Sequence, residues 1–299
     1  MKKISWIPAY TEKAASTRIR VLSPHNSINK FYSDKFESFL GYQPDSDVLI
    51  VQKEITPENL NYVQNFKGLK IYDFDDPMSH RWGFHEMISS VDIVTTDTVG
   101  RKEDFEKLEY KTPCIVVDDC LDYNINEILS IHENINNNIS WFGNHPNINS
   151  VMWMFEPILD NNYNINIISD VEYMSSEHHP NISLIKWDTS NFIENIQKSN
   201  ICVLSHRGEG KNIKSNNKML VAIACGLPCV VSDSTSYKEL SYQFNLDKFV
   251  VNNNENLLEA IKYLNEPINR KEYLSNIQHY VINKYSSKNI TKQLLNLIK

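Results

Sequence analysis

Short apolar runs rich in β-branched residues recur along the chain, and most are followed by a stretch with helical periodicity. Apolar runs of this length, bounded by turn residues, are typical of strands buried on both faces in a parallel sheet. We expect strands at residues 4–7, 48–52, 69–74, 91–95 and 114–117, and then at 139–143, 165–169, 182–187, 201–205, 228–232 and 249–251.

Amphipathic segments separate these runs and predict helices. The expected helices include residues 28–40, 57–66 and 81–90, then 150–159, 191–198, 217–225, 236–244, 256–264, 270–285 and 289–298. Strands that alternate with helices in this way predict doubly wound sheets joined by right-handed crossovers. The sequence therefore predicts the α/β class, with a Rossmann-like series in each half.

The length of 299 residues fits two domains better than one. A polar run at 133–138, between an expected helix at 126–132 and the strand at 139–143, is the best boundary. We therefore expect one domain at 1–137 and a second at 138–299, whose final helix is able to cross back to the first domain. Two such domains facing across a cleft would place ligands at the carboxyl ends of their strands.

Composition excludes several other classes of protein. The net charge of −7 argues against a general nucleic-acid binder. No stretch approaches the roughly 20 apolar residues of a membrane span, and the first residues lack the apolar run of a signal peptide. The five cysteines stand mostly in strand-like segments, as buried reduced thiols do, which favours a cytoplasmic protein.

Residues 205–240 carry the most chemical information. They predict a strand end, a basic glycine-containing loop, a helix, a Gly-Pro turn, a strand and another helix. Gly208 and Gly210 permit close approach of the backbone to a ligand, and Ser215 or Asn216 is placed to cap the helix. The helix amides and the surrounding cations predict an anion site for a diphosphate. The cations are Arg207, Lys211, Lys214 and Lys218.

This segment resembles the donor-binding segment of bacterial GT-B glycosyltransferases of the family-four-like kind. Residues 214–218 (KSNNK) match the lead-in of that group, and Glu239 matches a glutamate common in its next helix. The helix-to-strand part is matched by Ala222, Ala224, Gly226, Pro228, Val230 and Val231. The match has motif support over residues 139–299 and is architectural over the first half.

The resemblance implies transfer of a sugar from a nucleotide-sugar donor to a saccharide or lipid-linked acceptor in bacterial surface-glycan synthesis. It also implies that 1–137 is the acceptor-side domain and that 138–299 is the nucleotide-sugar-binding domain. It implies a retaining reaction without a metal or other cofactor, and an enzyme in the cytoplasm or peripheral on the cytosolic face of the inner membrane. Within this scheme we expect Arg207 and Lys211 to bind the diphosphate and Glu239 to bond donor hydroxyls. Gly143, Gly208, Gly210, Lys214, Ser215, Asn216 and Lys218 complete the expected donor site.

Two departures from the family pattern concern the donor. Val221 stands where the group has a glutamate that bonds the nucleotide ribose, and valine accepts no hydrogen bond. The loop at 143–146 (GNHP) lacks the Arg and Lys that many relatives place there for the phosphates. Arg207 and Lys211 are expected to substitute for them.

Five residues of the first half are candidates for the acceptor side. Similar Ser-x-Arg-x-Arg stretches face the acceptor in related transferases, and a His or Asp in this half supplies the base of inverting enzymes. The candidates are Arg18, Arg20, His25, His85 and Asp119. The run Asp73, Asp75 and Asp76 suggests a metal site, but a turn and helix capping explain it better, and no metal site is predicted.

Three alternatives to a retaining transferase stay open. The valine at 221 is compatible with an inverting GT-B enzyme, which includes one that uses a CMP-sugar. An epimerase or phosphorylase also uses paired Rossmann-like halves. A non-catalytic GT-B-like subunit of a glycan-assembly complex would not need the missing glutamate. The sequence does not specify the donor sugar, the acceptor, the linkage or the oligomeric state.

Overall fold

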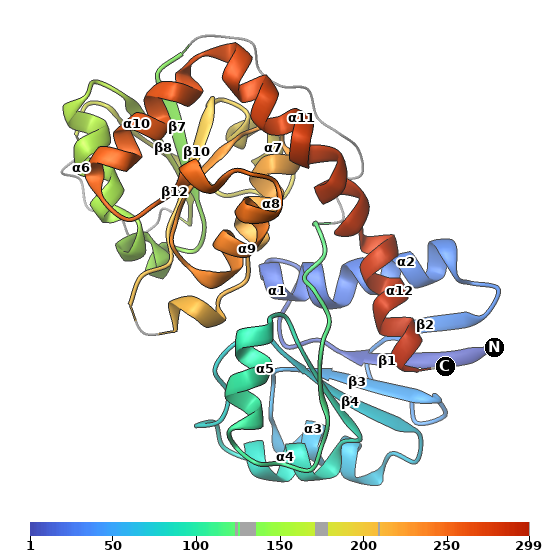
Figure 1. Ribbon diagram of the computed structural model, residues 1–299. Helices are drawn as coiled ribbons and strands as arrows, with labels where there is room; N and C mark the ends of the chain where they lie inside the picture. The colour runs from blue at the N-terminus through green and yellow to red at the C-terminus, as the bar shows by residue number, and fades with distance from the viewer. Residues whose placement is uncertain (123–124, 126–135, 171–178, 209, 299) are drawn as a thin grey trace. The chain divides into compact units, whose positions relative to one another are not determined.

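The computed structural model describes residues 1–122, 125, 136–170, 179–208 and 210–298. The chain forms two compact units (Figure 1). Unit 1 comprises Met1–Asn124 and Lys284–Lys299, and unit 2 comprises Ile125–Asn283. The helix expected at 126–132 and residues 133–135 of the polar run at 133–138 lie outside the described residues.

Unit 1 contains a six-stranded parallel sheet in the order β2-β1-β3-β4-β5-β6. Its strands are β1 (Lys2–Ile7), β2 (Phe36–Leu40), β3 (Val48–Gln52), β4 (Leu69–Phe74), β5 (Ile93–Thr96) and β6 (Cys114–Val116). Its helices are α1 (Ala15–Thr17), the π-helix η1 (Arg18–Leu22), α2 (Ser23–Phe31), α3 (Pro57–Asn65), α4 (Phe84–Ser90), α5 (Val99–Glu106) and α12 (Ser287–Leu297). One face packs Leu49, Val51 and Tyr72 against the helices α3, α4 and α5 (Figure 1).

Residues 36–40 were predicted as the end of a helix, and this prediction is wrong. The helix α2 ends at Phe31, and β2 pairs in parallel with β1 at the edge of the sheet. Phe36 and Ser38 are buried while the residues between and after them are partly exposed, which is the period of a strand. Ser38 accepts a hydrogen bond from the indole Nε1 of Trp6 at 2.9 Å. That contact depends on a residue 32 positions away, so the local pattern did not reveal it.

Unit 2 contains a second six-stranded parallel sheet, in the order β12-β11-β10-β7-β8-β9. Its strands are β7 (Asn138–Phe142), β8 (Asn164–Ser169), β9 (Ile182–Lys186), β10 (Ile201–Leu204), β11 (Cys229–Ser232) and β12 (Val250–Val251). All six lie within one residue of their predicted bounds. The two parallel sheets with flanking helices confirm the predicted α/β class.

The helices of unit 2 also follow the prediction closely. They are η2 (His145–Ser150), α6 (Met152–Asp160), α7 (Phe192–Ile196), η4 (Lys211–Ile213), α8 (Asn217–Ala224), α9 (Thr235–Gln243), η5 (Asp247–Phe249), α10 (Asn254–Asn265) and α11 (Pro267–Lys284). None of the helices in the described part of the chain has the length and apolar character needed to cross a membrane. All five cysteines are buried, and none of them forms a disulfide bond.

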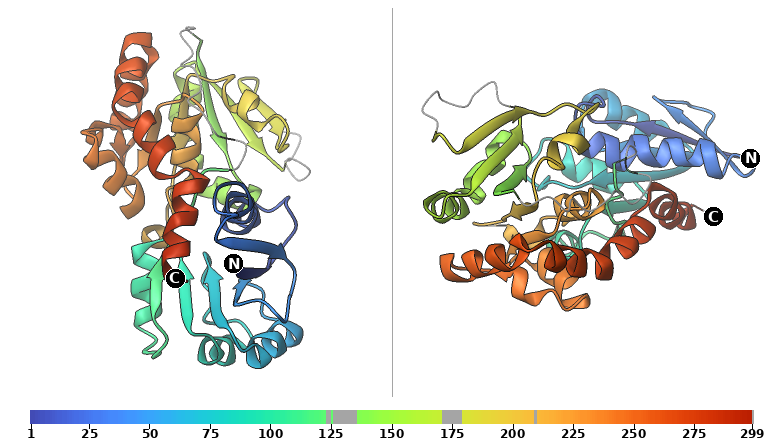
Figure 2. Two further views of the ribbon diagram at one scale, coloured as in Figure 1. Left: turned by 90° about the vertical axis from the view of Figure 1, so that its right-hand side faces the viewer. Right: turned by 90° about the horizontal axis from the view of Figure 1, so that it is seen from above.

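The last helix, α12, belongs to unit 1, where it lies alongside α2 (Figure 2). Its buried residues include Ile290 and Leu294, which face the side of the sheet that carries Trp6. The Lys2 ammonium donates to the carbonyl of Ile298 at 2.8 Å, and the Tyr32 hydroxyl donates to the carbonyl of Lys288 at 3.0 Å. The chain therefore completes the N-terminal unit with its C-terminal segment.

Candidate functional site

The polar groups of unit 2 gather where β7, β10 and β11 end. Gly143 follows β7 directly, and His206 lies two residues beyond β10. The backbone amide of His206 donates to Ser232 Oγ at the end of β11 (2.8 Å), and that hydroxyl donates to the carbonyl of His206 (3.2 Å). These two bonds fix the loop after β10 to the neighbouring strand, so its orientation is set by the sheet.

Lys218 lies in the first turn of α8, and its side chain packs against Gly143. A Cβ atom on Gly143 would stand 2.8 Å from Lys218 Cε and 3.5 Å from its Nζ. The first contact is shorter than a real Cβ makes, so the lysine would have to move aside, and the φ of +153° at Gly143 also disfavours a side chain. Glycine therefore leaves room for the end of the Lys218 side chain, which lies at the end of β7.

The ammonium of Lys218 has no carboxylate partner among the residues that the structure describes. Burial, followed by the positive charge of Lys214, lowers the pKa of Lys218 to about 8. A desolvated cation without a counter-charge is unfavourable, and a bound anion would relieve this cost. The first turn of a helix favours the same kind of ligand, since its amides and dipole attract negative charge.

His206 holds the segment that leads into α8. Its ring stacks on Tyr237 with centroids 4.7 Å apart and planes 13° from parallel. Its Nε2 lies 3.2 Å from the carbonyl of Ser215, so Nε2 carries the proton and donates to it. Burial and the charge of Lys218 lower the pKa of His206 to about 3, so the ring is neutral at physiological pH. The histidine is thus a neutral support beside the lysines.

The expected side-chain cap of α8 does not form. Asn216 is the N-cap residue, and its side chain accepts no hydrogen bond from the helix. Ser215 contributes its carbonyl to His206, and the carbonyl of Lys214 accepts from Ser236 Oγ at 2.7 Å. The lead-in is therefore held by contacts with neighbouring elements, which short-range capping rules do not predict.

Arg207 and Lys211, the predicted diphosphate ligands, both have protein partners. The guanidinium of the exposed Arg207 lies 3.7 Å from the ring centroid of Trp153. Lys211 Nζ lies 3.1 Å from Asp233 Oδ1, and both side chains are about one-third exposed. Gly208 and Gly210 have φ values of +86° and +79°, which glycine adopts without strain.

Glu239 is exposed on α9. The structure thus groups Gly143, Lys214, Ser215 and Lys218 around the start of α8. The roles assigned to all these residues remain predictions.

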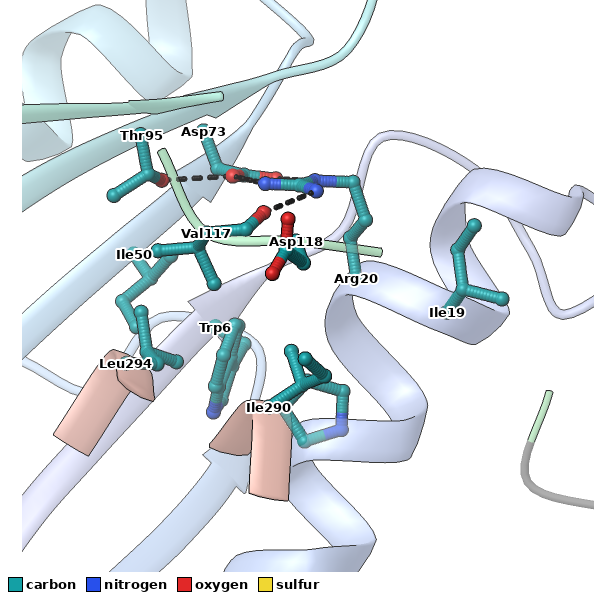
Figure 3. A pocket seen from close by; sticks show the side chains of 11 residues that line it. Trp6, Ile19, Arg20, Ile50, Asp73, Thr95, Val117, Asp118, Ile290 and Leu294 are labelled. Carbon is teal, nitrogen blue, oxygen red and sulfur yellow. Dashed lines mark hydrogen bonds and ion pairs between the residues drawn. The ribbon is translucent and has the colours of Figure 1, made fainter. Parts of the chain in front are cut away.

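In unit 1, Arg20 is buried in a network of ion pairs (Figure 3). Its guanidinium contacts Asp73 Oδ1 at 2.6 Å and Asp119 Oδ1 at 2.8 Å, and donates to the carbonyl of Val117 at 3.1 Å. Thr95 Oγ1 donates to Asp73 at 2.7 Å. Two acceptor-side candidates, Arg20 and Asp119, therefore bond to each other.

The cavity beside this network is small. It is lined by Trp6, Arg20, Asp73, Asp118 and Leu294, among others, and offers about 20 Å³ to water (Figure 3). That volume holds about one water molecule. A sugar does not fit into it.

The other three acceptor-side candidates differ in environment. Arg18 is buried, and its Nε contacts Asp122 Oδ2 at 2.7 Å. His25 Nδ1 lies 2.8 Å from Ser38 Oγ, and burial lowers the pKa of this histidine. His85 is exposed on α4 and hydrogen-bonds to the hydroxyl of Tyr110.

The aspartate run that suggested a metal site is engaged by basic side chains. Asp73 pairs with Arg20, while Lys53 Nζ contacts Asp75 at 2.5 Å and Asp76 at 2.7 Å. Over the described ranges, no group of three His, Cys, Asp or Glu side chains is placed to hold a metal ion.

Replacement of Arg20 tests the structural importance of the unit 1 network. Arg20→Met should lower the free energy of unfolding by about 3–5 kcal/mol, because it leaves the buried carboxylates of Asp73 and Asp119 uncompensated. Urea-induced unfolding measures the change. Lys102→Met, which removes a surface pair with Glu106, should hardly alter stability. Equal effects of the two substitutions would contradict a structural role for Arg20.

Comparison with protein families finds a match that covers part of unit 2 and continues into α12 of unit 1. Residues 152–296 match the family described as Glycosyl transferase-like. No curated protein matches the chain. The matched segment includes α8, Lys218 and Glu239, so the resemblance seen in the sequence is confirmed for this region.

Solved structures with similar folds extend over both units. A Staphylococcus aureus TarM mutant, in complex with fondaparinux, alpha-GlcNAc-glycerol and UDP, is 16% identical, with 84% of this chain and 55% of that chain covered and a TM-score of 0.62. The lipopolysaccharide outer core galactosyltransferase WaaB is 12% identical, with 100% and 99% covered and a TM-score of 0.60. The chain thus spans about half the length of TarM and nearly all of WaaB.

A third similar structure belongs to a different reaction class. A Listeria monocytogenes protein assigned as a UDP-N-acetylglucosamine 2-epimerase is 14% identical, with 100% of this chain and 96% of that chain covered and a TM-score of 0.60. At these identities the comparisons establish a shared fold but not a shared reaction.

Proposed function

We propose, from the GT-B fold of the chain and the glycosyl transferase-like domain at residues 152–296, that this protein transfers a sugar from a nucleoside diphosphate sugar to a saccharide or lipid-linked acceptor. The observation that carries the proposal is the Lys218 ammonium beside Gly143 at the start of α8, which has no carboxylate partner among the described residues. Its chemistry favours a polyanion, and the donor of such a reaction supplies a diphosphate.

Lys218 has the leading role in this proposal, ahead of Arg207 and Lys211. Lys211 already faces Asp233, which offsets part of its charge, while Lys218 has no such carboxylate in the described part of the chain. Together with the first-turn amides of α8 and with Lys214, it would stabilise the negative charge that develops on the leaving diphosphate. Arg207 and Lys211 remain proposed secondary contacts.

The compared structures suggest which donor and setting to test first. The TarM complex contains UDP, so UDP is the first nucleotide to examine. WaaB acts on the lipopolysaccharide outer core, which supports a role in bacterial surface-glycan synthesis. We propose a retaining reaction, as the resemblance implies. Analysis of the anomeric configuration of the product would separate it from inversion, and a CMP-sugar belongs in the donor panel as the alternative.

A sugar-nucleotide epimerase is the second candidate, because the Listeria monocytogenes protein shares the fold. The two reactions differ in their products. A transferase increases the mass of the acceptor by one sugar residue, whereas an epimerase changes the sugar and leaves the acceptor unchanged. Mass analysis of a donor and acceptor mixture distinguishes them.

The anion site predicts the behaviour of a Lys218 variant. Lys218→Met should weaken UDP binding by about tenfold or more, since a hydrogen bond to a charged group contributes about 1.5–3 kcal/mol. Isothermal titration calorimetry measures the affinity. The control is Lys262→Met, which removes an exposed lysine of α10 and should leave UDP affinity unchanged. Wild-type affinity in the Lys218 variant would rule out this site.

The pKa of Lys218, about 8, predicts a pH dependence of UDP binding. The protonated ammonium binds the diphosphate, so affinity is retained below pH 8 and lost as the pH rises through that value. A change from pH 7 to pH 9 should weaken binding by about tenfold, the change in the protonated fraction of the free enzyme. Lys218→Met measured over the same range should lack this dependence. If UDP affinity fell equally with pH in the wild type and in Lys218→Met, the pH dependence would belong to another titratable group.

Glu239 is predicted to bond hydroxyl groups of the donor. Glu239→Gln should lower kcat/KM for sugar transfer by about tenfold, because a charge-assisted hydrogen bond becomes a neutral one. The assay follows the mass of the glycosylated acceptor with the donor found in the panel. Glu259→Gln, an exposed glutamate of α10, is the matched control and should keep full activity. Equal activity of both variants would remove Glu239 from the donor site.

A further inference from the structure

A second polar groove lies on unit 2, lined by none of the residues grouped around Lys218. It offers about 340 Å³ to water and is formed by the end of α9, the turn η5, and the helices α10 and α11 (Figure 1). Its polar lining includes Gln243, Asn245, Lys248, Asn269, Glu272 and Asn276. The volume falls at the lower end of the range of about 300–1,000 Å³ that small-molecule sites occupy.

Amide side chains dominate this lining. Each presents both a donor and an acceptor, which is the pairing that sugar hydroxyls need. Asn269 Nδ2 donates to the carbonyl of Tyr263 at 2.8 Å, which orients the amide and leaves its Oδ1 to accept. Within the described ranges, the side chains of Asn245 and Asn276 form no hydrogen bond with the protein. These amides are therefore available to a ligand.

Aromatic rings and a balanced charge complete the groove. The half-buried Tyr263 carries the Lys248 ammonium 3.6 Å from its ring centroid, and its hydroxyl lies 3.4 Å from Glu272 Oε2. Phe244 also lines the groove, with its ring 4.8 Å from that of Tyr280. The charges of Lys248 and Glu272 cancel, so the lining has no net charge that would favour an anion. Its amides would be costly to cover with an apolar ligand, because their hydrogen bonds with water would be lost.

We propose that this groove binds a neutral saccharide, separately from the donor site. Amides that pair with hydroxyls, next to aromatic surface that packs against the C–H faces of sugar rings, match this class of ligand. The site would hold a glycan chain on the enzyme without taking part in transfer. Saccharide binding in the groove does not depend on the proposed function. Only the role given to the bound glycan rests on it.

In the test, the full chain is titrated with chitotriose and with maltotriose in separate experiments, and isothermal titration calorimetry measures the affinity for each. At least one should bind, and Asn276→Ala and Asn245→Ala should each weaken that binding by about threefold to tenfold, the loss of one or two hydrogen bonds. Ser275→Ala is the matched control, because Ser275 is exposed next to Asn276 and does not line the groove. It should bind as the wild type does. UDP affinity should be the same in all three variants.

Three results would overturn the proposal. They are no binding of either trisaccharide at millimolar concentrations, binding that both asparagine variants leave unchanged, and competition of the saccharide with UDP. Tighter binding of trigalacturonate than of the neutral sugars would also overturn it, because the groove would then select charge. Failure of the proposed function has a separate readout, since it would show as absent UDP binding and absent transfer whatever the trisaccharides do.

Discussion

A parallel sheet covered by helices on both faces leaves its polar groups few places other than the ends of its strands. The strands β3 and β10 are buried over their whole lengths, so neither has room for a functional side chain in its middle. Backbone pairing within each sheet satisfies the amides and carbonyls there. Side chains that carry chemistry are therefore concentrated at the carboxyl edges, where Gly143 and His206 lie in unit 2 and Asp73 lies in unit 1.

The two units use these edges differently. In unit 1, Arg20 bonds to Asp73 at the end of β4 and to Asp119 just after β6, and the remaining cavity holds about one water. In unit 2, Lys218 lies beside Gly143 without a carboxylate partner in the described part of the chain. A buried pair of opposite charges is stable as it stands, whereas a desolvated single charge is stabilised only when an anion arrives. The edge of unit 2 therefore carries a partly buried cation whose charge no described carboxylate offsets.

The sequence predicted the strand and helix order well, because apolar runs and helical periodicity are local signals. It missed β2, where a strand pattern of five residues was absorbed into a longer helical one. The sequence also did not reveal that Arg20 is engaged in an ion pair, because its partner Asp73 is 53 positions away and no local pattern indicates such a pair. The same limit hid the contact of Lys218 with Gly143, which joins residues that are far apart in the sequence.

Val221 and Lys218 lie three residues apart on α8, so the residue at 221 affects the surroundings of the lysine. Residues three apart on a helix share a face, so a glutamate at 221, as in the resembled group, would lie within reach of the Lys218 ammonium. The buried Val221 cannot pair with it. Val221 therefore leaves α8 without that carboxylate, and Lys218 has no carboxylate partner among the described residues. An anion at the start of α8 would meet the lysine without competition from a carboxylate on the same face of the helix.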